Sequence, residues 1–279
     1  MATKPVVAGA DGSPESVRAV EWAAREAAMR GTSLRIVSIA SMPPRMTPNS
    51  ATPDTVAGRI EQAAADALST AASRAAAAAP GVAVETALTE HAAPATALVE
   101  SGRDAMMLVL GSRGAGGFSA LILGSVSRYA ATHAACPVAI VREETMTAHR
   151  EVVVGVHDPA EATAALSFAF EAAALRNARL VATHARSRTS FGGHEEPAEE
   201  EQRALDAALA TWREKYPGVP ASAEIMHAHP GRVLAGASAR AGLVVLGRHA
   251  RGAGHGAGVG SVTHAVFSHA HGPVVSVPG

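Results

Sequence analysis

An internal repeat constrains the fold of this chain more than any other feature of its sequence. The stretch "VVAGADGSPESVRAVEWAAREAAMRGTSLRIVSIA" from Val6 aligns without a gap on "VVVGVHDPAEATAALSFAFEAAALRNARLVATHAR" from Val152. A second match pairs "MLVLGSRG…LGSVSRYAATHAACPVAIV" with "LVVLGRHA…VGSVTHAVFSHAHGPVVSV". The chain is therefore expected to contain two copies of one domain, fused in tandem.

A polar segment separates the two copies. The sequence "REETMTAHRE", residues 142–151, has neither a strand pattern nor a core pattern. We therefore expect a first domain over residues 1–143, a linker over 144–149 and a second domain over 150–279. A chain of 279 residues is long for one domain and comfortable for two.

Within each copy, short apolar runs alternate with amphipathic helical stretches. In the first copy, strands are predicted near residues 5–10, 34–39, 82–88, 105–110 and 137–141, and helices near 14–30, 54–79, 94–102 and 124–135. Ser13, Pro14 and Gly31 are suited to cap, begin and end the first helix. Because the strands are unbroken Val, Ile and Leu runs, they predict a sheet covered on both faces. The expected fold class is α/β: two tandem doubly wound domains, each a five-stranded parallel sheet with helices on both faces.

The composition limits which partners and which cellular compartment can be expected for this chain. With a net charge of -1 and 3% aromatic residues, the chain offers neither a basic surface nor stacking platforms for nucleic acid. The single cysteine, Cys136, excludes an intrachain disulfide and fits a reducing compartment. No secretory signal is visible in "MATKPVVAGADGS", and no stretch is suited to span a membrane. We therefore expect a cytoplasmic protein that binds neither nucleic acid nor membrane.

A glycine-rich segment, "LGSRGAGGFSALILGSVSR", runs from a predicted strand into a predicted helix. Such turns often hold phosphate, because backbone N–H groups and the helix dipole both favour an anion. A Walker-type site is excluded, since neither Lys4 nor Lys215 follows a glycine loop, and no G-x-G-x-x-G fingerprint of dinucleotide binding occurs. The pattern that is present is G-x2-G-x9-G-S, formed by Gly111, Gly114, Gly124 and Ser125.

This glycine pattern, together with "VVAGADGSPES" near the start and "CPVAIVR" at the end of the first copy, resembles the universal stress protein family in its tandem form. The resemblance covers nearly the whole chain. It implies a Rossmann-like, adenine nucleotide α-hydrolase-like fold, membership of the subgroup that binds ATP, and assembly through the last strand of the sheet. It also implies a regulatory or signalling role in stress or growth arrest rather than well-defined catalysis.

The resemblance assigns roles to residues of the first copy. Asp11 would bind the ribose hydroxyls, for which a carboxylate is a good acceptor. Ile39 would border the adenine, and the glycines would let the backbone approach the sugar and the phosphates. The implied nucleotide-binding set is Gly9, Asp11, Ile39, Gly111, Arg113, Gly114, Gly124, Ser125 and Val126.

Two of these residues also have a purely structural interpretation. Asp11 and Gly12 could form an ordinary turn, because both residue types favour turns. Arg113 could be a solvated loop residue rather than a partner of phosphate. The sequence leaves both alternatives open.

The second copy departs from the pattern at two positions. His157 stands where Asp11 stands, and Ala250 replaces the second glycine. An imidazole offers fewer acceptor sites than a carboxylate, and a methyl group at position 250 is costly if the backbone there is left-handed. The second copy is therefore either a degenerate domain retained for assembly or a nucleotide site formed by Gly155, His157, Ala185, Gly247, Ala250, Gly260, Ser261 and Val262.

Three classes of function fit these observations. The favoured one is an ATP-binding regulatory module, with Mg²⁺ accompanying the nucleotide. The alternatives are a slow ATPase or a nucleotidyl or phosphoryl transferase, for which no general base is obvious, and a scaffold that binds no nucleotide. No catalytic residue and no dedicated metal site are predicted, although His227 and His229 are separated by a single residue. A homodimer is expected, with a protein partner that the sequence does not identify.

Overall fold

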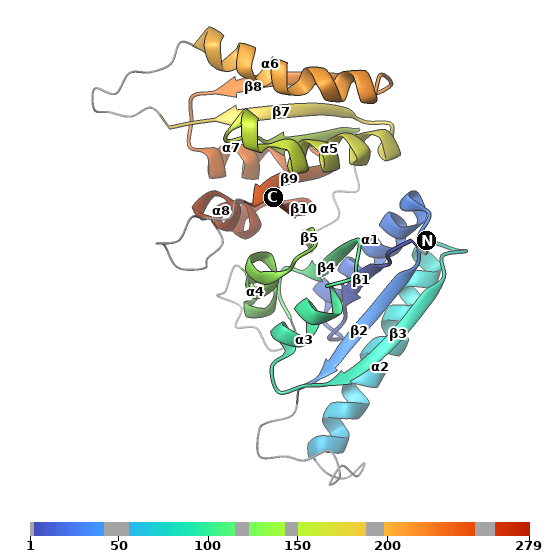
Figure 1. Ribbon diagram of the computed structural model, residues 1–279. Coiled ribbons are helices and arrows are strands. Elements are labelled where there is room, and N and C mark those ends of the chain that lie inside the picture. Colours follow the sequence, from blue (N-terminus) through green and yellow to red (C-terminus); the bar gives the residue numbers. More distant parts are fainter. Residues whose placement is uncertain (1–2, 42–55, 115–122, 143–149, 188–197, 249–259) are drawn as a thin grey trace. The chain divides into compact units, whose positions relative to one another are not determined.

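The computed structural model of the chain describes residues 3–41, 56–114, 123–142, 150–187, 198–248 and 260–279. It divides the chain into two compact units, residues 1–142 and 143–279. Each unit contains its own parallel sheet with helices on both faces (Figure 1).

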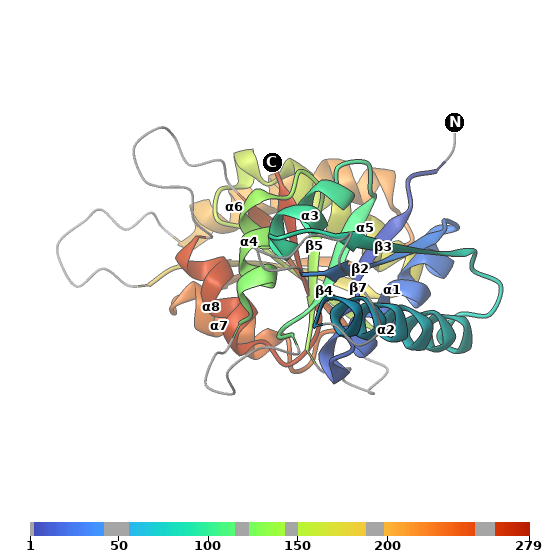
Figure 2. The same cartoon turned by 90° about the horizontal axis from the view of Figure 1, so that it is seen from below.

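The first unit alternates strands and helices along the chain. Its elements are β1 (Val6–Gly9), α1 (Pro14–Arg30), β2 (Leu34–Ala40), α2 (Val56–Ala78), β3 (Val84–Glu90), α3 (Pro94–Ser101), β4 (Met107–Gly111), α4 (Ser125–His133) and β5 (Val138–Val141). The strands lie in the order β3-β2-β1-β4-β5, and every pair is parallel. Figure 2 shows α1 and α2 on one face of this sheet and α3 and α4 on the other.

Strand β1 lies at the centre of the first sheet because its side chains are apolar in both directions. Val6 pairs with Leu34 of β2 on one side and with Met107 of β4 on the other. Val6, Val7 and Ala8 are fully buried, as expected for a strand covered by helices on both faces. By contrast, the outer strand β3 consists of half-buried and exposed residues, which is usual at a sheet edge.

The ends of α1 follow the sequence signals. Ser13 caps the helix, since its Oγ accepts a hydrogen bond from the Ser16 N–H at 3.1 Å, and Pro14 is the first helical residue. Gly31 ends the helix in the left-handed conformation, with φ of 62°. The capping prediction is confirmed.

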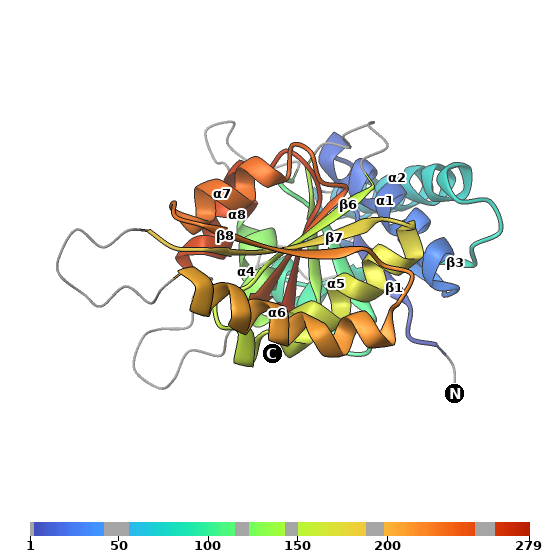
Figure 3. The same ribbon diagram turned by 90° about the horizontal axis from the view of Figure 1, so that it is seen from above.

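The second unit repeats this architecture. Its elements are β6 (Glu151–Gly155), the 3-10 turn η2 (Pro159–Glu161), α5 (Thr163–Arg176), β7 (Arg179–Ala185), α6 (Ala198–Lys215), β8 (Ala221–Met226), α7 (Pro230–Ala237), β9 (Leu243–Arg248), α8 (Ser261–His269) and β10 (Val274–Pro278). The strand order is β10-β9-β6-β7-β8, again all parallel. Figure 3 shows α5 and α6 on one face of the sheet and α7 and α8 on the other.

The two units differ at the start of the helix that follows their first strand. In the first unit, Gly12 has a φ of 81° and α1 begins two residues later. In the second unit, Asp158 stands at the position of Gly12 and accepts a hydrogen bond from the Ala160 N–H at 2.8 Å. Since a left-handed conformation is unfavourable for Asp compared with Gly, the chain forms a 3-10 turn there, and α5 begins only at Thr163.

The predicted fold class is confirmed: the chain contains two tandem α/β units with parallel sheets and helices on both faces. Among the described residues, none of the helices combines the length and the apolar character needed to cross a bilayer.

Candidate functional site

The strand order of the first unit reverses between β1 and β4. From β1 the chain continues to β2 and β3 on one side of the sheet, whereas β4 is followed by β5 on the other. Parallel α/β sheets bind ligands at such a point, outside the carboxyl ends of the strands. The loops that leave this edge are Gly9–Ser13 after β1 and Gly111–Gly124 after β4, and both carry predicted site residues.

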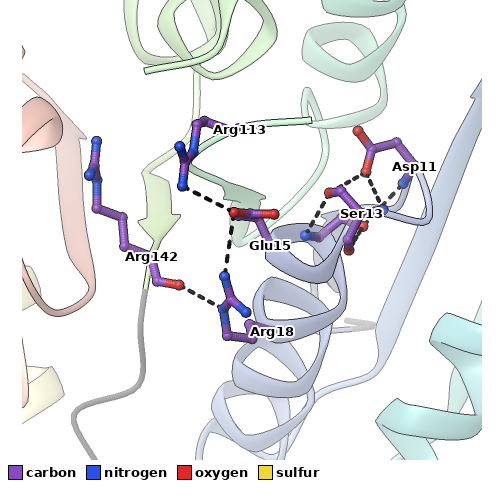
Figure 4. A network of polar contacts seen from close by, with 7 residues as sticks. Asp11, Ser13, Glu15, Arg18, Arg113 and Arg142 are labelled. Carbon is purple, nitrogen blue, oxygen red and sulfur yellow. Dashed lines mark hydrogen bonds and ion pairs between the residues drawn. The ribbon is translucent and has the colours of Figure 1, made fainter. Parts of the chain in front are cut away.

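Asp11 lies at the start of this edge and is held by the first turn of α1. Its Oδ1 accepts hydrogen bonds from the Ser13 N–H at 3.0 Å and from the Ser13 hydroxyl at 2.6 Å. The Asp11 N–H in turn donates to the Ser16 hydroxyl at 3.3 Å. Figure 4 shows this turn at the N-terminus of α1. The carboxylate is thus exposed to solvent and fixed in orientation, which suits it to receive hydroxyl groups of a ligand.

The glycines of the loop after β4 allow close approaches that a side chain would prevent. A Cβ atom placed on Gly114 would overlap with Oδ2 of Asp11. A Cβ atom on Gly111 would lie 2.8 Å from the backbone carbon of Glu15 and 2.9 Å from its oxygen. The loop after β4 therefore contacts both the turn after β1 and the first turn of α1.

The loop closes on the N-terminus of α4. The Gly124 N–H donates to the Ser112 carbonyl at 2.8 Å, and the Ser127 hydroxyl donates to the Gly111 carbonyl at 2.7 Å. Gly124 is the N-cap residue and supplies no capping side chain. The first turn of α4, which includes the exposed Ser125 and the half-buried Val126, therefore begins with backbone N–H groups suited to an anion.

Two further predicted residues of the first unit lie farther along the same edge. Ile39 is half-buried near the end of β2, the strand next to β1. Gly9 is buried at the end of β1, and a Cβ atom there would lie 2.7 Å from Cδ2 of Leu110. Neither residue contributes a polar side chain, so each can act only through its shape or its backbone.

Arg113 is paired with a carboxylate that the sequence did not single out. Its Nη2 lies 3.3 Å from Oε1 of Glu15, and Nη2 of Arg18 lies 3.6 Å from the same oxygen. The Arg18 Nε–H donates to the Arg142 carbonyl at 2.8 Å, as Figure 4 shows. The sequence did show an acidic residue in the first turn of a predicted helix, where the helix dipole stabilises a negative charge. Its pairing with Arg113 could be seen only in the tertiary structure.

The second unit brings the equivalent positions to the same edge of its sheet. Gly155 ends β6 and Gly247 lies in β9, on either side of the strand-order reversal. His157 is exposed after β6, while Ala185 is buried at the end of β7. At the start of α8, Gly260 is the N-cap without a capping side chain, followed by the exposed Ser261 and the half-buried Val262. Ala250 lies outside the described residues.

The second unit also has a hollow beside the acidic residue that corresponds to Glu15. A cavity of about 240 Å³ is lined by Glu161, Ala164, Ala165, Gly247, Arg248, Val277 and Gly279. In the repeat alignment Glu161 corresponds to Glu15, and Ala164 corresponds to Arg18. The second unit thus keeps the acidic residue and lacks the arginine.

The histidines near the end of β8 do not lead to a metal site in the described part of the chain. His229 is the N-cap of α7, and His227 precedes it by two residues. Within the described ranges, no group of three or more His, Cys, Asp or Glu side chains is arranged to hold a metal ion.

Comparison with known proteins gives a consistent result for the whole chain. A family model described as the universal stress protein family matches residues 2–142 and 149–278. A universal stress protein of Mycobacterium tuberculosis is 34% identical over 282 residues, which cover 97% of this chain and 95% of the relative. The match extends over both units.

Solved structures of universal stress proteins are also similar to this chain. A crystal structure described as a universal stress protein in complex with cAMP is 32% identical and covers 50% of this chain and 98% of its own, with a TM-score of 0.41. A universal stress protein from Archaeoglobus fulgidus covers 99% of this chain and 97% of its own, with a TM-score of 0.75 and 18% identity. At that identity, the likeness supports the fold alone.

Proposed function

This chain belongs to the universal stress protein family, and we propose that its first unit binds ATP and acts as a nucleotide-dependent regulatory module. The main observation behind the proposal is that Gly114 lies against the carboxylate of Asp11 at the point where the strand order reverses. The resemblance between the sequences of the two loops and the family pattern assigns the ligand; the arrangement of the loops supports it.

The roles of the residues follow from the groups they offer. Asp11 would accept hydrogen bonds from the ribose hydroxyls, because its carboxylate is exposed and held by Ser13. Gly111 and Gly114 would let the backbone lie against the sugar and phosphates. Gly124 would let the loop close on Ser112, and the N–H groups of Ser125 and of the rest of the first turn of α4 would bind phosphate. Mg²⁺, where present, would accompany the phosphates.

The second unit supports the same function less well. It has His157 in place of the carboxylate, and its loop after β6 forms a 3-10 turn instead of the glycine turn. The second unit therefore lacks a carboxylate at the position where Asp11 would accept hydrogen bonds from the ribose. We propose one nucleotide per chain, bound in the first unit, and a homodimer as the assembled form.

The first test is a count of nucleotide in the protein as purified. The protein is denatured, and the released nucleotide is identified by chromatography and counted per chain; ATP binding is then measured by calorimetry after dialysis. About one adenine nucleotide per chain supports the proposal. Two would show that the second unit also binds, and none, together with no calorimetric signal, would contradict nucleotide binding altogether.

A pair of variants tests the assigned site. Asp11→Asn removes the charge and one strong acceptor, so we expect ATP affinity to fall about tenfold, in the range for hydrogen bonds to charged groups. Asp158→Asn is the matched control, since Asp158 also caps a turn directly after a first strand. Equal affinities for the two variants would contradict the role of Asp11. Product formation measured in the same samples distinguishes a binding module from a slow ATPase.

A further inference from the structure

We infer that Glu15 determines how strongly the first unit discriminates between nucleotides of different phosphate charge. This inference rests on the proposed nucleotide binding and adds a residue to it. Glu15 is located in the first turn of α1, and its Oε1 is shared by Arg113, at 3.3 Å, and Arg18, at 3.6 Å. Arg113 belongs to the loop that would hold the phosphates, so the carboxylate and a phosphate would attract the same guanidinium.

Glu15 is the fixed end of this pair. Its side chain is 18% exposed, against 42% for Arg113. The backbone of Glu15 lies against Gly111, where a Cβ atom would be only 2.8 Å from its carbon. We therefore expect the Glu15 carboxylate to stay in place when Arg113 turns towards a ligand, so that the arginine divides its charge between the two.

Arg18 is not an equivalent donor for the ligand. Its Nε–H is bound to the Arg142 carbonyl at 2.8 Å, on the side of Glu15 away from Asp11 (Figure 4). The contact between Glu15 and Arg18 is thus anchored to the end of β5, whereas the contact between Glu15 and Arg113 involves the phosphate loop. Loss of the carboxylate would leave two cations beside the loop where there is now a net charge of one.

The second unit has different residues at two of these three positions. The second unit keeps the acidic residue as Glu161 but has Ala164 in place of Arg18, and a cavity of about 240 Å³ lies beside Glu161. The position that corresponds to Arg113 is His249, outside the described residues. The shared carboxylate with its two arginines therefore accompanies the unit whose glycine pattern is complete.

The test compares Glu15→Gln with a matched control, Glu21→Gln. Glu21 is also located on α1 and is paired with Arg74 at 2.5 Å, away from the glycine loop. Dissociation constants for AMP, ADP and ATP are measured at low and at high salt. We expect Glu15→Gln to bind ATP about fivefold more tightly, ADP by a smaller factor and AMP by less than about twofold, because the repulsion removed grows with ligand charge.

Salt and a second substitution separate this role from a structural one. The gain in Glu15→Gln should disappear at high salt, since exposed charges are then screened, and it should be lost when Arg113→Met is added. A change of equal size for AMP and ATP, or weaker ATP binding by a folded Glu15→Gln, would overturn the inference while leaving nucleotide binding in place. No binding by the wild-type protein would overturn the proposed function and, with it, this inference.

Discussion

Two glycines that end strands in the first unit face different neighbours. A Cβ atom on Gly9 would approach Cδ2 of Leu110, the far end of a side chain that can rotate away. A Cβ atom on Gly111 would approach the backbone carbon and oxygen of Glu15, which cannot move without displacing α1. The same methyl group therefore meets a soft neighbour at one position and a rigid one at the other.

This contrast predicts unequal costs for two alanine substitutions. We expect Gly9→Ala to lower the free energy of unfolding by about 1 kcal/mol, because the Leu110 side chain can move away from the new methyl group. We expect Gly111→Ala to lower it by about 3 kcal/mol, because the backbone of Glu15 cannot. Urea denaturation measures both. Gly236→Ala is the control, because a Cβ atom there would meet nothing within 4 Å. Equal losses at positions 9 and 111 would show that the N-terminus of α1 yields as easily as a leucine side chain.

The first long helix of each unit ends at a residue in the left-handed conformation, but the residue type differs between the units. Gly31 ends α1 with a φ of 62°, and Asn177, which aligns with it, ends α5 with a φ of 47°. Asn tolerates the left-handed region better than most residues but still carries a Cβ atom. The second unit therefore retains a small strain that the first has avoided.

Substitutions at the two cap residues should shift stability in opposite directions. Asn177→Gly is expected to raise the free energy of unfolding by about 0.5–1 kcal/mol, and Gly31→Ala to lower it by about 1 kcal/mol. Thermal unfolding of both variants measures the change. A loss of stability in Asn177→Gly would mean that the asparagine side chain contributes more than its backbone strain costs.

Helix α6 contains a carboxylate whose environment gives a pH dependence. The hydrogen bond from Gln202, at 2.9 Å, is the main cause that lowers the pKa of Asp206 below its usual value, and the hydrogen bond and charge of Arg213 lower it further. Arg213 also donates to the Ala221 carbonyl of β8 at 3.1 Å. A lowered pKa in the folded state means that the ionised carboxylate adds stability above its unfolded pKa.

That stability should be lost as the pH falls through the folded pKa of Asp206. The effect is below about 1 kcal/mol, since the pair is partly exposed. We expect Gln202→Leu to reduce the pH dependence of the free energy of unfolding between about pH 5 and pH 2, and to reduce it more than Arg213→Met does. Urea midpoints as a function of pH measure this. An unchanged slope in Gln202→Leu would exclude the hydrogen bond as the main cause.

The elements of the first unit were predictable because local signals specify them. Its observed strands and helices begin and end within two residues of the predicted ranges. Apolar runs, the Ser13 cap and Gly31 all act over a few residues, which a sequence pattern can represent. The 3-10 turn of the second unit was not predicted. It follows from the replacement of the left-handed Gly12 by Asp158, and the sequence pattern does not show that Gly12 is left-handed.

The site was predictable only in part, for the same physical reason. The spacing of Gly111, Gly114 and Gly124 indicates a loop that must approach something closely, but not what it approaches. The contact between Glu15 and Arg113 joins residues 98 positions apart. Neither residue type nor spacing indicates that contact, because it depends on the register of β1 and β4 and on where α1 begins.

At the scale of the whole molecule, the two units share one topology and differ in the residues at the carboxyl ends of their strands. The strands of each unit come from one contiguous stretch of sequence, and each unit has its own buried residues. The complete glycine pattern lies in the first unit, as do Glu15 and the two arginines paired with it. A ligand of the first unit should therefore stabilise that unit directly and the second only through coupling between them.

Calorimetry of the intact chain should reveal this inequality. At a hundredfold excess over its dissociation constant, ATP should stabilise the first unit by about 2.7 kcal/mol. The corresponding part of the heat absorption should move up by roughly 5–10 °C, while the rest should stay near its original temperature. A uniform shift of the whole transition, in a chain shown to bind one nucleotide, would mean that the units unfold together.

The contiguity of the first unit also has a consequence for the chain as it is made. Its last strand ends at Val141, and all its predicted ligand-binding residues precede that strand. Translation at about 5–20 residues per second takes several more seconds to produce the second unit. The first unit can therefore fold as it leaves the ribosome, and the nucleotide binding proposed for it would then begin before the second unit is complete.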